Sequence, residues 1–215
     1  MHKKIKISTR KLNAIETKNK LLQSALYLFS HFGFDKVTVE DITRSAGVAK
    51  GTFYSHFATK EQVLVEQFSK IENSYKEVYD NRKPSETAEQ LALNFIDAMC
   101  KFCCDEWGLD FLKVVYSNQI SLGSHPLILL NKDRLFYHSL EDIVKLGQDR
   151  GEFTKDLSVE EQVYLFASIC RSLLYEWCLH NGSYNLREAG QKSCKIVLKY
   201  IRAAPDHVGS DTDLK

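Results

Sequence analysis

The sequence predicts an all-α protein, built from an N-terminal three-helix domain and a larger C-terminal helical bundle. Apolar residues recur at steps of three and four along most of the 215 residues, which is the period of an amphipathic helix. The chain contains 3 prolines and no run of strand-like alternation, and its 44% apolar content is enough for a packed core. These features together favour helices throughout.

Punctuating residues and charge divide the chain into four expected parts. We expect a basic disordered arm over residues 1–11, a first domain over 12–60, a helical body over 61–204 and a disordered tail over 205–215. The first helix is expected from about Asn13 to His31 and is closed by Gly33. Its inward-facing residues are expected to be Ile15, Leu22, Ala25, Leu26, Phe29 and Phe32.

The next stretch predicts two short helices joined by a glycine turn. Thr38 and Asp41 have the spacing of a reciprocal cap, which starts a helix over Val39–Ala46. Gly47 supplies the left-handed position that ends this helix. A second helix is expected over Ala49–Phe57, with its two phenylalanines inside. This arrangement is a helix-turn-helix, whose second helix can enter the major groove of DNA.

The body is expected to consist of longer helices. Thr59 is placed to cap the first of them, whose apolar stripe is Leu64, Phe68, Ile71, Tyr75 and Val78. After a break near Pro84, further helices are expected from Ala88 to near Gly108, over Leu109–Leu122, and from near Leu127 with Leu129 inside it. Ser158 and Glu161 form a second capping box. The last helix carries two apolar rows, which indicates burial against more than its own chain.

The residues from Leu12 to Phe68 resemble the DNA-binding domain of the TetR family of bacterial transcriptional regulators. The resemblance rests on the run A-L-Y-L-F-S-H-F-G-F, the turn glycine, the F-Y-S-H-F run and Lys60, all in register. Ala49 departs from it, because the family often has a Ser or Thr there. The resemblance implies a homodimeric regulator, expected to be a repressor, that binds a palindromic operator in double-stranded DNA and is released by a small-molecule effector.

Charge supports a nucleic-acid partner. Residues 1–60 hold eleven Lys or Arg against four Asp or Glu, a net of +7, whereas the remainder holds eighteen against twenty-four, a net of −6. A basic end on an acidic body is typical of a protein that meets phosphates. No apolar run is long enough to span a membrane and no signal peptide is recognisable, so we expect no membrane partner and a cytoplasmic location.

Lys50 is the candidate base-reading residue, because lysine commonly contacts guanine O6 or N7 and Lys50 stands at the start of the second helix. Gly51 suits a close approach of the backbones, and Thr52 suits a thymine methyl or a phosphate. The resemblance adds Tyr54, Ser55, His56 and Lys60 as phosphate contacts. The remaining candidate contacts with DNA are Thr38 and Arg44.

The body is rich in aromatic residues, which favours a pocket for a small apolar or aromatic effector. The candidate effector contacts are Phe95, Met99, Phe102, Trp107, Phe111, Tyr116, Phe136, Tyr137 and Trp177. The resemblance places a homodimer interface on the last two helices, although burial of both stripes in the core of the same chain is the alternative. The candidate interface residues are Val163, Phe166, Cys170, Leu173, Trp177, Val197 and Ile201.

Two other classes of function have less support in the sequence. The chain has none of the glycine-rich or H-E-x-x-H motifs of common enzymes, and we expect no catalytic residues, no cofactor and no metal. Cys100, Cys103 and Cys104 have a spacing that a thiol or metal sensor could use, although burial on the apolar stripe is the alternative. A constitutive DNA-binding dimer without an effector is the other alternative.

Overall fold

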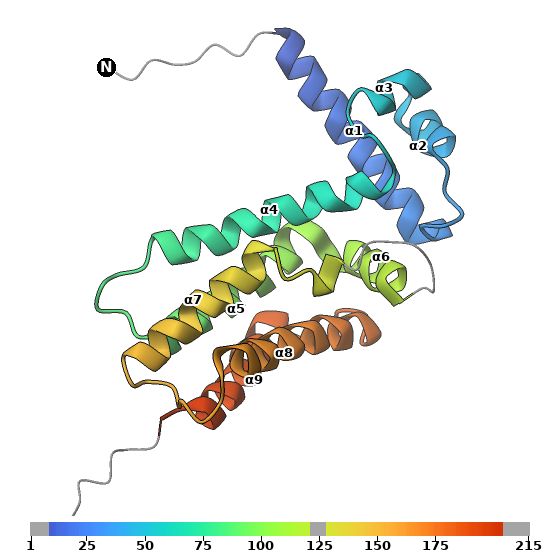
Figure 1. Ribbon diagram of the computed structural model, residues 1–215. Helices are drawn as coiled ribbons and strands as arrows, with labels where there is room; N and C mark the ends of the chain where they lie inside the picture. Colours follow the sequence, from blue (N-terminus) through green and yellow to red (C-terminus); the bar gives the residue numbers. More distant parts are fainter. Residues whose placement is uncertain (1–8, 121–127, 204–215) are drawn as a thin grey trace, which may run out of the picture.

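The computed structural model describes residues 9–120 and 128–203 and confirms the all-α fold. The helices are α1 (Thr9–Phe32), α2 (Val39–Ala46), α3 (Lys50–Tyr54), α4 (Glu61–Asp80), α5 (Ala88–Phe102), α6 (Gly108–Ile120), α7 (Leu135–Asp149), α8 (Val159–Leu179) and α9 (Leu186–Ile201). In these ranges no strand forms. The N-terminal helices α1 to α3 make one end of the molecule, and α4 runs from them along the body (Figure 1). Most of the expected arm, the whole of the expected tail and residues 121–127 lie outside the described residues.

Helix α1 begins earlier than expected, at Thr9 rather than about Asn13. Its core-facing residues are Leu21, Leu22, Ala25 and Phe29. Ile15 and Phe32 were expected inside, but they are 45% and 58% exposed. The prediction failed for these two because the other elements cover α1 only from Leu21 onwards and leave both ends of the helix uncovered. A helical period marks a face of the helix, but it does not show how far along that face the neighbouring elements reach.

Helix α4 has the expected buried stripe of Leu64, Phe68, Ile71 and Tyr75. Its start differs from the expectation, since the capping position is Lys60 and no side chain caps it. Gln62 Oε1 accepts the Ala58 N–H at 2.5 Å, which ties the start of the helix to the residues before it without capping its first amides. Thr59 is therefore not the cap.

Helix α7 begins at Leu135, not near Leu127, and Leu129 lies in a separate short 3₁₀ turn over Ile128–Leu130. The cause is a contact from α4. The Glu72 carboxylate accepts the Phe136 N–H at 2.9 Å and pairs with Arg134 at 2.6 Å, so it satisfies the amide end of the helix at that point. Similarly, α5 ends at Phe102 and continues to Gly108 as a π-helical turn over Cys103–Trp107.

The capping box of Ser158 and Glu161 at the start of α8 is confirmed. The stripe on α8 and α9 that was expected to form the dimer interface faces the interior of its own chain instead. Phe166, Cys170 and Ile201 are each at most 2% exposed, and the others are half-buried or buried: Val163, Leu173, Trp177 and Val197. The uncovered apolar residues of these two helices form a different row, namely Tyr164, Tyr175, Leu179, Ile196 and Tyr200.

Helix α9 packs closely against α5. A Cβ atom at Gly190 would lie 2.7 Å from the Cys100 sulfur and 3.2 Å from an Ile96 methyl carbon, so only glycine fits this contact without a shift. Cys100 on α5 and Cys194 on α9 are both buried. Among the described helices, none is long and apolar enough to cross a membrane.

Candidate nucleic-acid interface

A fixed turn sets the angle between α2 and α3. The Thr38 hydroxyl accepts the Asp41 N–H at 3.2 Å while the Asp41 carboxylate accepts the Thr38 N–H at 3.0 Å, as the sequence predicted. Gly47 ends α2 at φ 68°, and the following Val48 N–H reaches back to the Thr43 carbonyl at 3.0 Å. Because a side chain is strained at this φ, glycine is what allows the chain to turn directly into α3.

Helix α3 spans five residues, shorter than the expected Ala49–Phe57. Ala49 offers no side-chain cap, and residues 55–56 form turns rather than helix, with the His56 N–H bonded to the Phe53 carbonyl at 2.9 Å. Phe53 and Phe57 are buried as expected, with ring centroids 5.4 Å apart. These two rings hold α3 against the domain core and turn its other face outwards.

That outer face carries most of the candidate contacts. Lys50, Gly51, Tyr54 and Ser55 are exposed, whereas Thr52 and His56 are half-buried. The Ser55 hydroxyl donates to the Thr52 carbonyl at 2.7 Å. At the two ends of α2, Thr38 and Arg44 are also exposed. The candidates from both helices are therefore exposed or half-buried at the surface of the domain.

Lys60 has a different environment from the other candidates. Its ammonium donates to the carbonyl oxygens of Phe34, Val37 and Asp35 at 2.8, 3.2 and 3.4 Å. It also lies 4.4 Å from the centroid of the Phe34 ring. An ammonium has three donors, and here all three are directed at the loop between α1 and α2. The geometry gives Lys60 a structural role, tying the start of α4 to that loop.

Lys50 is paired with a residue that the sequence did not single out. Its ammonium hydrogen-bonds to the Glu40 carboxylate, so the first residue of α3 is joined to the second residue of α2. This hydrogen bond lowers the pKa of Glu40 and raises the pKa of Lys50, so both groups are held in their charged forms. The two residues are ten apart and separated by the glycine turn, so no helical period could have predicted the contact.

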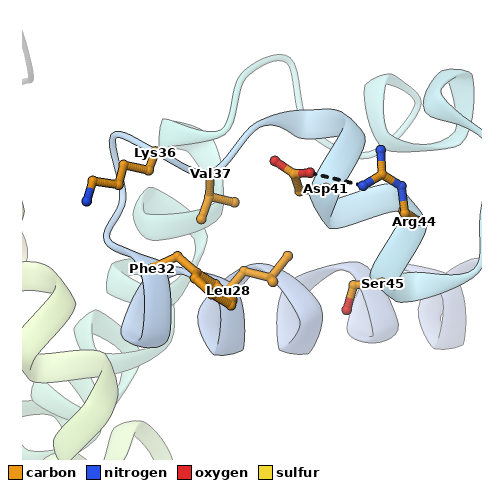
Figure 2. A pocket seen from close by; sticks show the side chains of 7 residues that line it. All are labelled: Leu28, Phe32, Lys36, Val37, Asp41, Arg44 and Ser45. Carbon is orange, nitrogen blue, oxygen red and sulfur yellow. Dashed lines mark hydrogen bonds and ion pairs between the residues drawn. The ribbon is translucent and has the colours of Figure 1, made fainter.

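A groove of about 480 Å³ lies between α1 and α2 (Figure 2). Leu28, Phe32 and Val37 supply its apolar part, and Lys36 and Arg44 its charges. The guanidinium of Arg44 reaches Asp41 at 3.4 Å, and Figure 2 draws this contact between the two side chains on α2. Arg44 therefore lies at the edge of an apolar groove as well as beside the outer face of the helix-turn-helix.

The aromatic candidates for effector binding pack against one another inside the body. Tyr75 and Phe95 stack at 4.6 Å, and Phe136 lies 5.6 Å from both rings. Met99, Phe111, Tyr116 and Trp177 are buried as well, while Phe102, Trp107 and Tyr137 are half-buried. Phe102 lines a groove of about 670 Å³ between α4 and α5.

Two buried donors near this aromatic cluster have no partner. Of the side-chain atoms that the structure describes, Gln67 Nε2 and Trp107 Nε1 are buried without a hydrogen bond. The Trp107 ring contacts Phe68, Phe102 and Phe111 at centroid distances of 5.0, 5.7 and 4.7 Å, which places it where α4, α5 and α6 meet. Unpaired buried N–H groups are uncommon and costly, so they call for an explanation.

The cysteines are free thiols, and five of the six are buried. Burial raises the pKa of Cys100 to about 12 and raises the pKa of Cys103 and Cys104 as well. A thiol with a raised pKa is a poor nucleophile and a poor metal ligand at neutral pH. Across the described chain, no group of three or more His, Cys, Asp or Glu residues is arranged to hold a metal ion.

Comparison with known proteins gives consistent matches. Residues 21–66 match the family model described as "Bacterial regulatory proteins, tetR family". The transcriptional repressor KstR2 of Mycobacterium tuberculosis is 26% identical over 189 residues, covering 84% of this chain and 90% of that protein. Two solved structures share the fold. FadR of Bacillus subtilis with stearoyl-CoA has a TM-score of 0.68 at 19% identity, over 86% of this chain and 99% of that one. A SmeT–triclosan complex has a TM-score of 0.71 at 16% identity, and the match covers 93% of this chain and 100% of that one.

Proposed function

Because the chain belongs to the TetR family of bacterial regulatory proteins, we propose that it is a homodimeric repressor that binds a palindromic operator and releases it when a small effector binds. Its relatives are transcriptional regulators, and the chain is a regulator and not an enzyme. DNA binding is assigned to residues 12–60 together with the start of α1, and effector binding and dimerisation to residues 61–204.

One observation carries the DNA-binding part of the proposal. Phe53 and Phe57 anchor α3 in the domain core, so Lys50, Gly51 and Tyr54 face outwards beside the N-terminus of α2. Side chains at the start of a recognition helix reach base edges, while those around it contact phosphates. In this arrangement Lys50 reads bases, Thr38, Arg44, Tyr54, Ser55 and His56 position the backbone, and Thr52 has either role.

Replacement of Lys50 tests this part. Lys50→Ala should reduce the preference for operator over random DNA by about 5- to 150-fold, the range that corresponds to one specific base contact. Lys145→Ala is a matched control, because Lys145 is equally exposed at 54% and ion-paired, but lies on α7. Fluorescence anisotropy with both kinds of DNA measures the ratio. An equal loss on operator and random DNA would show that Lys50 contacts only the backbone.

The dimer is proposed on the exposed row of α8 and α9. Ile196 and Tyr200 are one turn apart and are 68% and 70% exposed, an unusual amount of uncovered apolar surface on one helix. Tyr164, Tyr175 and Leu179 extend this surface onto α8. A two-fold axis through such a face would set the distance between two recognition helices, as two operator half-sites require.

Charge reversal on this face tests the interface. Ile196→Glu should yield monomers, because a carboxylate buried in the interface without a partner is costly. Ile120→Glu is a matched control, since Ile120 is 64% exposed and lies on α6. Sedimentation velocity measures the mass of each variant. Dimers that persist in Ile196→Glu would place the interface elsewhere.

The effector site is proposed where α4, α5 and α6 meet. Phe68, Phe102 and Phe111 offer apolar contacts there, and the unpaired N–H groups of Gln67 and Trp107 would bond to an acceptor on a ligand. An apolar chain or ring that carries an oxygen acceptor satisfies both features. The stearoyl-CoA and triclosan named with the two structural relatives have this character.

Titration with such compounds tests the site. Binding of the effector should quench or shift the fluorescence of Trp107. Saturating operator should lower the affinity for the effector by the same factor by which the effector lowers the affinity for DNA. Gln67→Leu should lower the affinity for an oxygen-bearing ligand and leave the affinity for its hydrocarbon analogue unchanged. A ligand that binds equally well with and without operator would favour the constitutive dimer.

A further inference from the structure

Glu40 occupies an unfavourable position for a DNA-binding surface. It lies beside Lys50, and their side chains are 51% and 54% exposed on the face assigned to the operator. A carboxylate there approaches the phosphates of the DNA and is repelled by them. Thr38, Lys50 and Arg44 are all suited to phosphate, whereas Glu40 has only acceptors and cannot bond to it.

The structure of the domain does not require this carboxylate. Exposed ion pairs contribute little to stability, and α2 already has its capping box and a second acidic residue, Asp41, in its first turn. Glu40 makes no hydrogen bond to the Thr38 cap, whose partner is Asp41. Its place in the first turn of α2 and its bond to Lys50 favour a negative group there, and a role in recognition is a further physical reason for one.

Together, Glu40 and Lys50 present an acceptor and a donor side by side. In the major groove a C·G pair presents the complementary pattern, because cytosine N4 donates and guanine O6 and N7 accept. An A·T pair also offers a donor, adenine N6, but only guanine offers two adjacent acceptors on one base, O6 and N7, for the lysine. A phosphate offers only acceptors. The carboxylate also holds the Lys50 ammonium between the two helices, which reduces its freedom to turn to a nearby phosphate.

We propose that Glu40 is a specificity-determining residue, which accepts a hydrogen bond from cytosine N4 in a C·G pair of each half-site while Lys50 donates to the guanine. This proposal rests on the proposed operator binding and adds the base pair that is read. It assigns Glu40 an unfavourable contribution to binding of random DNA and a favourable one at a single position of the operator.

Selection of binding sites from random DNA, with wild type and Glu40→Ala, tests the proposal, because alanine has no acceptor whereas glutamine would keep one. The wild type should enrich a motif with a C·G pair at one position of each half-site. Glu40→Ala should keep the rest of the motif, lose preference at that position by about 5- to 150-fold, and bind random DNA more tightly. Asp80→Ala is a matched control. It also removes one carboxylate from an exposed ion pair, with Lys76, but at the far end of α4.

A chemical substitution in the DNA isolates the contact. N4-methylcytosine at the selected position should weaken DNA binding by the wild type and should have a much smaller effect on Glu40→Ala, since the variant has no acceptor at this position. Circular dichroism confirms that the variant is folded. Identical base preferences and equal responses to N4-methylcytosine in both proteins would overturn the role of Glu40 but leave the proposed function standing. Failure of the wild type to enrich any motif would overturn the proposed function as well.

Discussion

Replacement of Lys60 by methionine should destabilise the protein without weakening its contacts with phosphate. Lys60→Met keeps a long apolar side chain over Phe34 but removes the charge and its hydrogen bonds to the carbonyls of Phe34, Val37 and Asp35. The 2.8 Å bond to the Phe34 carbonyl is charge-assisted and corresponds to about 1.5–3 kcal/mol. The cation over the ring adds about 0.5–1 kcal/mol. The two longer bonds add little, so the expected loss is about 2–4 kcal/mol.

Urea denaturation followed by circular dichroism measures this loss, and salt titration of operator binding measures the number of phosphate contacts. If Lys60 bound a phosphate, Lys60→Met would lower the slope of log affinity against log salt by about 0.9. We expect the slope to stay the same. Lys20→Met removes an equal charge from an exposed pair with Glu16 on α1 and serves as the control for stability. Unchanged stability of Lys60→Met with a reduced slope would refute the structural role.

Three further predictions concern the body. Gly190→Ala should destabilise the protein by about 1–2 kcal/mol in urea denaturation, because the clash with Cys100 outweighs the better helix propensity of alanine; a gain in stability would show that α5 and α9 separate easily. Glu72→Gln should lower the free energy of unfolding by about 3 kcal/mol or more in the same assay, since it leaves Arg134 charged, about 11% exposed and without its partner. A small loss, close to that of an exposed ion pair, would show that water reaches the site. In thiol labelling at pH 8, Cys104 should react first, because it is exposed, whereas burial both hides the Cys100 thiol and raises its pKa to about 12. Rapid reaction of Cys100 would instead favour the thiol-sensor alternative.

Features set by neighbouring residues were predictable from the sequence. The capping boxes at Thr38 and Ser158 and the left-handed Gly47 depend on contacts within three or four residues, and the structure has all of them. The burial of Phe53 and Phe57 follows from the helical period in the same way. Each of these patterns has a local physical cause that the residue types alone express.

Contacts between distant segments were not predictable. Glu72 fixes the start of α7 from sixty-four residues away, and Lys60 bonds to a loop more than twenty residues before it. The pairing of Glu40 with Lys50 depends on the angle that Gly47 sets. A sequence pattern can state that a carboxylate or an ammonium is present, but only the fold determines which group lies next to it.

The apolar rows of α8 and α9 illustrate a related limit. The two apolar rows of α9 were visible in the sequence. That one of them packs against a second copy of the chain stays a proposal. Periodicity could not say which row faces the chain's own core. Val197 and Ile201 face α5 and the interior, while Ile196 and Tyr200 remain uncovered, because the close contact at Gly190 fixes the rotation of α9.

The N-terminal domain is attached to the body by more than α4. Helix α1 also contacts α6 (Figure 1). In addition, Lys18 on α1 bonds to Glu66 on α4 at 2.7 Å. A rigid body held at one joint can swing in any direction, but one held at two places can turn only about the line that joins them. The geometry therefore leaves the DNA-binding domain a single easy axis of rotation. In the proposed dimer, an effector that displaced either α4 or α6 by a small distance would turn both recognition helices in a symmetric and predetermined sense.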